Sequence, residues 1–209
     1  LELSGTASGA FSDPGSAFTQ VTNGPVVSLF ESGVPYRPDA PYFDTVTSIR
    51  YTGSSFANVG EGEQLDLGLL NITNGITLLG TTAKTAKMDL YLHLPADGIT
   101  SFKLTTLLFS IDTTANQGGL VPDLFLIGHS DVNSLNVGGR KVSFDLNLTN
   151  PAFATGDGAS IREGQSATDG LYATLHFSPI PEPSTYALFG AALLAGVALW
   201  RRSRAGLSS

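Results

Sequence analysis

The sequence predicts an all-β fold: an antiparallel β-sandwich of jelly-roll type, followed by a single C-terminal transmembrane helix. Apolar and polar residues alternate in several segments, turn-forming residues separate these segments, and no stretch before Tyr186 keeps an apolar period of 3.6 residues. About nine or ten strands joined by short turns are typical of a sandwich, and a barrel is the alternative.

Alternation places the expected strands within residues 1–178, which form the predicted extracellular domain. Met88, Leu90 and Leu92, for example, share one face, opposite Asp89 and Tyr91. In chain order, the expected strands are Gly5–Phe11, Thr45–Tyr51, Gln64–Leu70, Met88–Leu94, Ser101–Ile111, Val142–Leu148 and Leu171–Phe177. Turns are expected between them at Asp13-Pro14-Gly15, Asn23-Gly24-Pro25, Asn74-Gly75, Ala96-Asp97-Gly98, Gln117-Gly118-Gly119, Val137-Gly138-Gly139 and Asp157-Gly158.

Composition excludes several classes of protein. With 209 residues, 42% of them apolar and 14% charged, the chain is expected to fold as one body and not to be disordered. The absence of cysteine excludes disulfides, thiolate metal sites and a cysteine nucleophile. A net charge of -7 argues against nucleic acid as a partner.

The last segment, residues 179–209, differs from the body in charge and hydropathy. Residues 1–180 hold 17 acids and 8 bases, whereas the remaining residues hold one acid and three arginines, Arg201, Arg202 and Arg204. The apolar run Tyr186–Trp200 is about 22 Å long as a helix, short of a hydrocarbon core of roughly 30 Å, so its length alone leaves a buried helix open.

The flanks of this run favour a membrane helix. Tyr186 and Trp200 suit the two interfaces, and the arginines suit the cytoplasmic side, which places the acidic body outside. An amphipathic or core helix is the alternative, although the run is apolar all round. An outward-facing body needs an export signal. Because the sequence begins at Leu1 without one, we expect that the signal has been removed, the alternative being an incomplete reading frame.

The residues Pro181, Glu182, Pro183 and Ser184, the apolar run and the arginine cluster together resemble the PEP-CTERM sorting signal of exopolysaccharide-producing Gram-negative bacteria. The resemblance implies a precursor in the inner membrane, cleavage near the prolines by an exosortase, and delivery to the cell surface or extracellular matrix. The prolines also force an extended backbone, which a protease-like enzyme can bind.

The body resembles the choice-of-anchor K domain, a β-rich extracellular module. The resemblance rests on Gly5–Phe11, the turn Phe30-Glu31-Ser32-Gly33, Glu63–Leu70 with Asn74-Gly75, and Ile111-Asp112-Thr113-Thr114-Ala115-Asn116. It carries over no catalytic residue and implies no cofactor.

Polar clusters in the body give only weak signals for chemistry. His93 and His176 fall on polar strand faces, and His129 lies beside Ser130 and Asp131 without any indication of a triad. Asp112, Asn116 and Asp123 are weak calcium candidates, because such residues in turns usually bond their own backbone. A second weak calcium candidate is the loop of Asp131, Asn133 and Asn136. Glu61 and Glu63 are interpreted as solvated loop charge.

A proline-stiffened loop, Pro35–Phe43, is the best candidate for a ligand site. Tyr36, Tyr42 and Phe43 could stack on sugars, as could Tyr51, Tyr91 and Tyr172, which are taken as exposed. Alternatively, the loop folds back onto the sandwich. We therefore expect a non-enzymatic exported protein associated with exopolysaccharide or a biofilm. The alternative is a carbohydrate-binding module, and the sequence favours binding of glycans over their hydrolysis.

Overall fold

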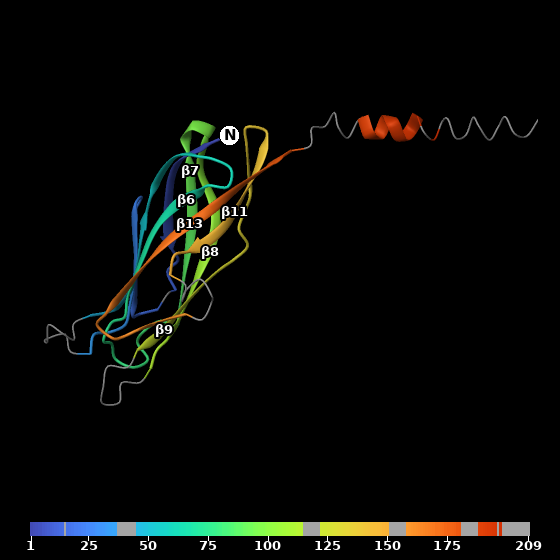
Figure 1. Cartoon of the computed structure of the whole chain (residues 1–209). Coiled ribbons are helices and arrows are strands. Elements are labelled where there is room, and N and C mark those ends of the chain that lie inside the picture. The colour runs from blue at the N-terminus through green and yellow to red at the C-terminus, as the bar shows by residue number, and fades with distance from the viewer. Residues whose placement is uncertain are drawn as a thin grey trace, which may run out of the picture.

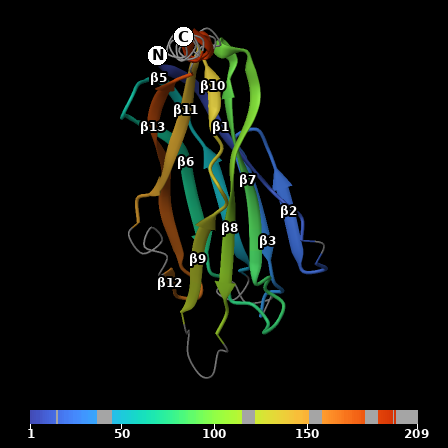
Figure 2. The same cartoon turned by 90° about the vertical axis from the view of Figure 1, so that its right-hand side faces the viewer.

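The computed structural model describes residues 1–14, 16–36, 45–114, 122–150, 158–180, 188–195 and 197. The body consists of two antiparallel sheets packed face to face and elongated along the strands (Figure 1 and Figure 2). The all-β, antiparallel prediction is therefore confirmed.

Each sheet is described by the order of its strands. Sheet A contains, from edge to edge, β12 (Ala159–Ile161), β9 (Asp123–His129), β8 (Ile99–Asp112), β7 (Thr85–Leu94), β1 (Leu3–Phe11) and β5 (Ser55–Val59). Sheet B contains β10 (Leu135–Val137), β11 (Arg140–Leu148), β13 (Ser166–Pro179), β6 (Gln64–Thr73), β4 (Thr47–Gly53), β3 (Val27–Ser32) and β2 (Thr19–Asn23). A 3₁₀ turn, η1 (Pro95–Asp97), joins β7 to β8.

The strand order differs from the jelly-roll prediction. A jelly roll is built from two Greek keys, whereas here β2-β3-β4 and β7-β8-β9 are runs of consecutive strands that stay within one sheet. Short connections join β2 to β3 and β7 to β8, as is possible between antiparallel neighbours, whereas longer ones join β3 to β4 and β8 to β9. The sheets also keep separate edge strands, so the described strands do not close into a barrel.

The structure contains strands that the alternation did not locate. Every expected strand is present, but β2, β3, β5, β9, β10 and β12 were not placed. β10 and β12 have only three residues, too few for a period of two to stand out. In β9 apolar residues fall on both faces, and in β3 serines occupy buried positions, so neither strand alternates cleanly. Most of the unplaced strands flank the longer strands, and β2, β5, β10 and β12 form the sheet edges.

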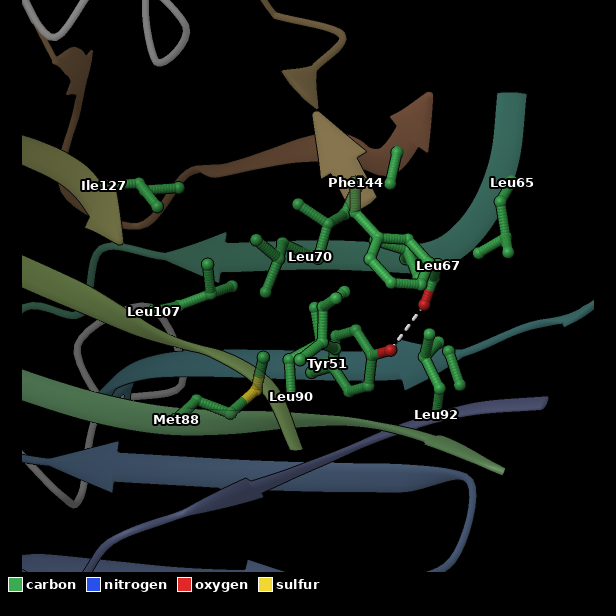
Figure 3. Close-up of a cluster of buried hydrophobic side chains, with 14 of the residues drawn as sticks. Tyr51, Leu65, Leu67, Leu70, Met88, Leu90, Leu92, Leu107, Ile127 and Phe144 are labelled. Carbon is green, nitrogen blue, oxygen red and sulfur yellow. Dashed lines mark hydrogen bonds between the residues drawn. The ribbon is translucent and has the colours of Figure 1, made fainter. Parts of the chain in front are cut away.

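The core lies between the two sheets and is lined by the inward faces of both. Leu65, Leu67, Met88, Leu90 and Leu92 are each fully buried (Figure 3). Burying a side chain of this size stabilises the fold by roughly 1.5–3 kcal/mol. The core therefore accounts for a stable body without disulfides.

Tyr51 is fully buried in this core, so its interpretation as an exposed aromatic was wrong. A β-bulge in β6 lies between the pairs Leu171↔Gly68 and Tyr172↔Asp66, and it leaves Leu67 outside the ladder with β13. The Tyr51 hydroxyl donates a hydrogen bond to the Leu67 carbonyl oxygen (Figure 3). Burial, with a smaller contribution from Asp66, raises the pKa of Tyr51 far above its usual value.

The two ends of the sandwich are distinct. Leu3, the turn between β10 and β11 and the end of β13 lie at one end, the C-terminal pole. The end of β8 and the start of β9 lie at the other, the distal pole (Figure 1). The β7–β8 connection at the C-terminal pole contains η1.

Beyond the body, the structure describes a helix over residues 188–195 (Figure 1). Leu188, Phe189, Leu193 and Leu194 in this helix are each 70–73% exposed, so these side chains are not packed in the sandwich core. Among the described residues, no helix combines the length and the apolar character needed to cross a bilayer. Much of the predicted span, including both aromatic flanks, lies outside those residues.

Candidate functional site

The junction between body and tail lies at the C-terminal pole. Strand β13 is paired with β11 through Arg140↔Pro179, and the described body ends at Ile180. The predicted processing residues Pro181, Glu182, Pro183 and Ser184 follow immediately in the sequence. These four residues, the flanks Tyr186 and Trp200, and Arg201, Arg202 and Arg204 lie outside the described residues.

A pocket of about 260 Å³ lies at the distal pole, and we call it the pole pocket. Segments from four parts of the chain line it, and hydroxyl groups, leucines, one phenol and two carboxylates face it together. Its lining residues include Tyr36, Leu78, Leu79, Thr82, Thr113, Thr114, Asp123 and Glu163. The sequence-predicted loop thus contributes Tyr36 to a pocket, whereas Tyr42 and Phe43 lie outside the described residues.

Backbone pairing holds Tyr36 at the pole pocket. The Tyr36 N–H donates to the Ile76 carbonyl at 2.9 Å, and the Leu78 N–H donates to the Val34 carbonyl at 2.8 Å. The Thr81 hydroxyl accepts from the Val34 N–H at 3.0 Å. Tyr36 nevertheless remains 53% exposed at the rim of the pocket.

The two carboxylates of the pole pocket are almost fully buried, with Asp123 4% and Glu163 5% exposed. Asp123 Oδ1 accepts hydrogen bonds from the Thr114 N–H at 2.7 Å and the Thr114 hydroxyl at 3.0 Å. Asp123 therefore ties the end of β8 to the start of β9. Sequence reasoning did not single out Glu163, which lies in the turn between β12 and β13 and has no motif around it.

The calcium candidates Asp112 and Asp123 do not form a metal cluster with described residues. Asp112 is exposed and sits opposite Leu124 in the β8–β9 ladder, and Asn116 lies outside the described residues. Within the part of the chain that the structure describes, no group of three histidine, aspartate or glutamate side chains could hold a metal ion.

The three histidines lie apart and contact their local neighbours. His93 on β7 hydrogen-bonds through Nε2 with the Ser8 hydroxyl at 2.7 Å and through Nδ1 with the Thr100 carbonyl at 2.5 Å. This Ser–His contact links neighbouring strands β1 and β7, and neither residue lines the pole pocket. His129 Nδ1 bonds the Ser130 carbonyl at 2.8 Å.

His176 and Glu61 lie together beside the end of β13. His176 Nε2 is 2.9 Å from Asp145 Oδ2, and its Nδ1 is 3.9 Å from Glu61 Oε1. Glu61 Oε2 also accepts the Phe177 N–H at 2.5 Å. Glu61 is thus an exposed loop carboxylate, as expected, with its side chain 55% exposed, and it also binds the backbone of β13, which the sequence did not indicate.

Asp89 carries the clearest electrostatic arrangement on the outer face of sheet A. Its Oδ1 is 2.8 Å from Lys103 Nζ and accepts from the Thr106 hydroxyl at 2.7 Å. Burial alone would raise the pKa of Asp89, but the hydrogen bonds and charge of Lys103, with Thr106 and Tyr91, hold it below its usual value. The arrangement is a surface ion pair and lies away from both poles.

Comparison with known proteins identifies one family match. Residues 179–203 match the PEP-CTERM protein-sorting motif. No curated protein matches the chain. The match begins at the last residue of β13, and such a signal indicates an exported precursor of Gram-negative bacteria that transits the membrane and is sorted by an exosortase.

Proposed function

We propose that the chain is the precursor of an exported, non-enzymatic surface or extracellular-matrix protein. Its apolar segment Tyr186–Trp200 inserts transiently in the inner membrane as a single helix, and exosortase cleaves near Pro181 and Pro183. The match to the sorting motif over residues 179–203 carries this proposal. The exposed leucines and Phe189 of the helix support it, because they remain available to lipid.

The mature body is the part that functions outside the cell. We propose that it is a choice-of-anchor K-like module that associates with exopolysaccharide in a biofilm. The sandwich has a large buried core, so it can stay folded in an oxidising space outside the cell without disulfides.

The mass of the C-terminus isolated from cells tests the sorting proposal. We expect the mature protein to lack the apolar run and the arginines in a host with exosortase, and to keep them when the exosortase is deleted. A double variant, Pro181→Ala with Pro183→Ala, should also accumulate as the uncleaved precursor. A mature protein that retains Trp200 in the wild-type host would refute the proposal.

The absence of enzymatic activity can be tested at Ser8 and His93. These residues have the distance of a nucleophile and its base, but the partner of His93 Nδ1 is a backbone carbonyl and not a carboxylate. We expect a fluorophosphonate probe to leave Ser8 unlabelled. Labelling that disappears in a His93→Ala variant would show a serine hydrolase.

A second candidate function is carbohydrate binding at the pole pocket. Its volume of about 260 Å³ lies just below the roughly 300–1,000 Å³ of most ligand pockets, which favours one sugar unit at a chain end. Tyr36 offers a ring, and the threonines and carboxylates offer hydrogen bonds. Because Thr114 already bonds one oxygen of Asp123, we propose binding in preference to hydrolysis.

A glycan array tests this second candidate. The wild-type body should bind glycans on the array. The variants Tyr36→Ala and Tyr42→Ala should each bind less, and the double variant should bind least. Phe18→Ala is the matched control, because Phe18 is 48% exposed and does not line the pole pocket. Absence of binding by the wild-type body would remove the idea.

A further inference from the structure

The last residues of β13 have a neighbouring strand on one side only. Along β11, pairing continues through Lys141↔Ser178 to the end of β13. Along β6, it stops at Thr174↔Gln64, because β6 begins there. Residues 175–179 would therefore present an open edge where β6 is missing.

The connection between β5 and β6 takes the place of the missing strand. The Gly62 N–H donates to the Leu175 carbonyl at 2.9 Å, and the Leu175 N–H donates to the Glu63 carbonyl at 3.2 Å. Two residues further on, the Phe177 N–H points to the same edge and donates to Glu61 Oε2 at 2.5 Å. A side-chain carboxylate thus extends the backbone ladder by one bond.

Phe177 is the last residue of β13 whose N–H lies on this edge of the strand. Backbone N–H groups of a strand alternate between its two edges. The next three positions of the alternation are Pro179, Pro181 and Pro183, and proline has no N–H. Within the described part of the chain, Glu61 therefore accepts the last N–H that β13 offers on this edge.

Among the contacts of Glu61, the bond to the backbone is the important one. The side-chain contacts of His176 with Asp145 and Glu61 involve groups that are 47–73% exposed, and contacts between such exposed groups contribute little to stability. A hydrogen bond to a carboxylate is stronger than a neutral one, and this one restrains the main chain directly.

We propose that Glu61 is a positioning residue for exosortase processing: its carboxylate fixes where the folded body ends. It thereby limits how much chain upstream of Pro181 the enzyme can bind in extended form. This inference rests on the proposed function. The rate of cleavage at such a junction depends on the fraction of molecules in which the end of β13 has opened. Because loss of the hydrogen bond increases this fraction, it should also increase the rate of cleavage.

Pulse labelling of the full-length precursor in its exosortase-containing host tests the proposal. Glu61→Ala should accelerate conversion to the mature form roughly threefold to tenfold. Glu61→Gln should stay within about twofold of wild type, because its amide oxygen still accepts the Phe177 N–H. Asp97→Ala, which removes a carboxylate in η1 at the same pole, is the matched control and should leave the rate unchanged.

Amide hydrogen exchange of the full chain gives a second, local readout. Exchange at Phe177 should accelerate by a similar factor in Glu61→Ala, while amides in the centre of β13 stay protected. Acceleration of exchange without faster processing would overturn the proposal, as would faster processing in Asp97→Ala. Wild-type precursor that is never cleaved would instead refute the proposed sorting function.

Discussion

The buried hydroxyl of Tyr51 gives the sharpest prediction for stability. The bulge in β6 leaves the Leu67 carbonyl out of the ladder with β13, and the Tyr51 hydroxyl donates to it. Tyr51→Phe removes the donor and leaves a buried acceptor unsatisfied, which costs about 1–3 kcal/mol. A body of this size loses about 2–4 °C of Tm for each kcal/mol, so we expect a decrease of roughly 2–12 °C.

Urea unfolding, monitored by far-UV circular dichroism, measures this loss of stability. The midpoint should fall while the m-value stays unchanged, because the exposed surface is the same. Tyr91→Phe is the matched control, because the hydroxyl of the half-buried Tyr91 makes a 3.3 Å contact with Asp89 on the outer face of sheet A and not in the core. If both variants have the stability of the wild type, the carbonyl of Leu67 does not depend on Tyr51.

The same residue predicts a pH dependence. Burial and Asp66 raise the pKa of Tyr51 in the folded state above the ordinary value of 10.0. Its contribution to stability is therefore fully present below pH 10.0 and is lost as the pH rises, because the unfolded chain ionises first. Above pH 10.0, stability should fall more steeply for wild type than for Tyr51→Phe. Parallel pH profiles would contradict the reasoning.

Three further perturbations test separate parts of the structure. Lys103→Met should raise the pKa of Asp89, which NMR titration can follow. In the wild type, the lowered pKa of Asp89 stabilises the fold above the ordinary carboxyl pKa, and this contribution is lost at lower pH. The variant should lack this contribution at every pH. Asn74→Ala should cost about 1–3 kcal/mol in urea unfolding, because the fully buried Asn74 amide donates to the Ile161 carbonyl at 2.8 Å. Truncation after Ile180 should change Tm by less than about 2 °C, because the described helix side chains are exposed and bury no core surface.

The sorting motif could be predicted from the sequence because its parts are consecutive. Prolines, an apolar run and arginines need no folded contact to be identified, and the match covers the same region. The long strands could be predicted for a related reason, since alternation is a local property. Tyr51 was wrongly predicted to be exposed. It lies on the same face of β4 as Thr47 and Ile49, and that face is buried, but an aromatic residue by itself does not indicate which face of a strand it occupies.

The site residues that sequence reasoning missed depend on distant partners. Glu163 reaches the pole pocket from the turn before β13, whereas Tyr36 comes from the segment after β3. Glu61 bonds a backbone N–H that lies 116 residues away. No local pattern distinguishes such residues from solvated charge, so they became visible only once the strand order was known.

The position of β13 also limits where the mature chain can end. Although β13 is the last of the described strands in sequence, it lies inside sheet B between β11 and β6, and Leu175 is fully buried. Cleavage before Phe177 would remove ladder pairs with β11 and expose strand edges. We therefore expect the mature C-terminus at or after Pro179. The C-terminal peptide of the secreted protein can be measured by mass spectrometry, and a folded mature form that ends before Leu175 would show that the sheet does not need the end of β13.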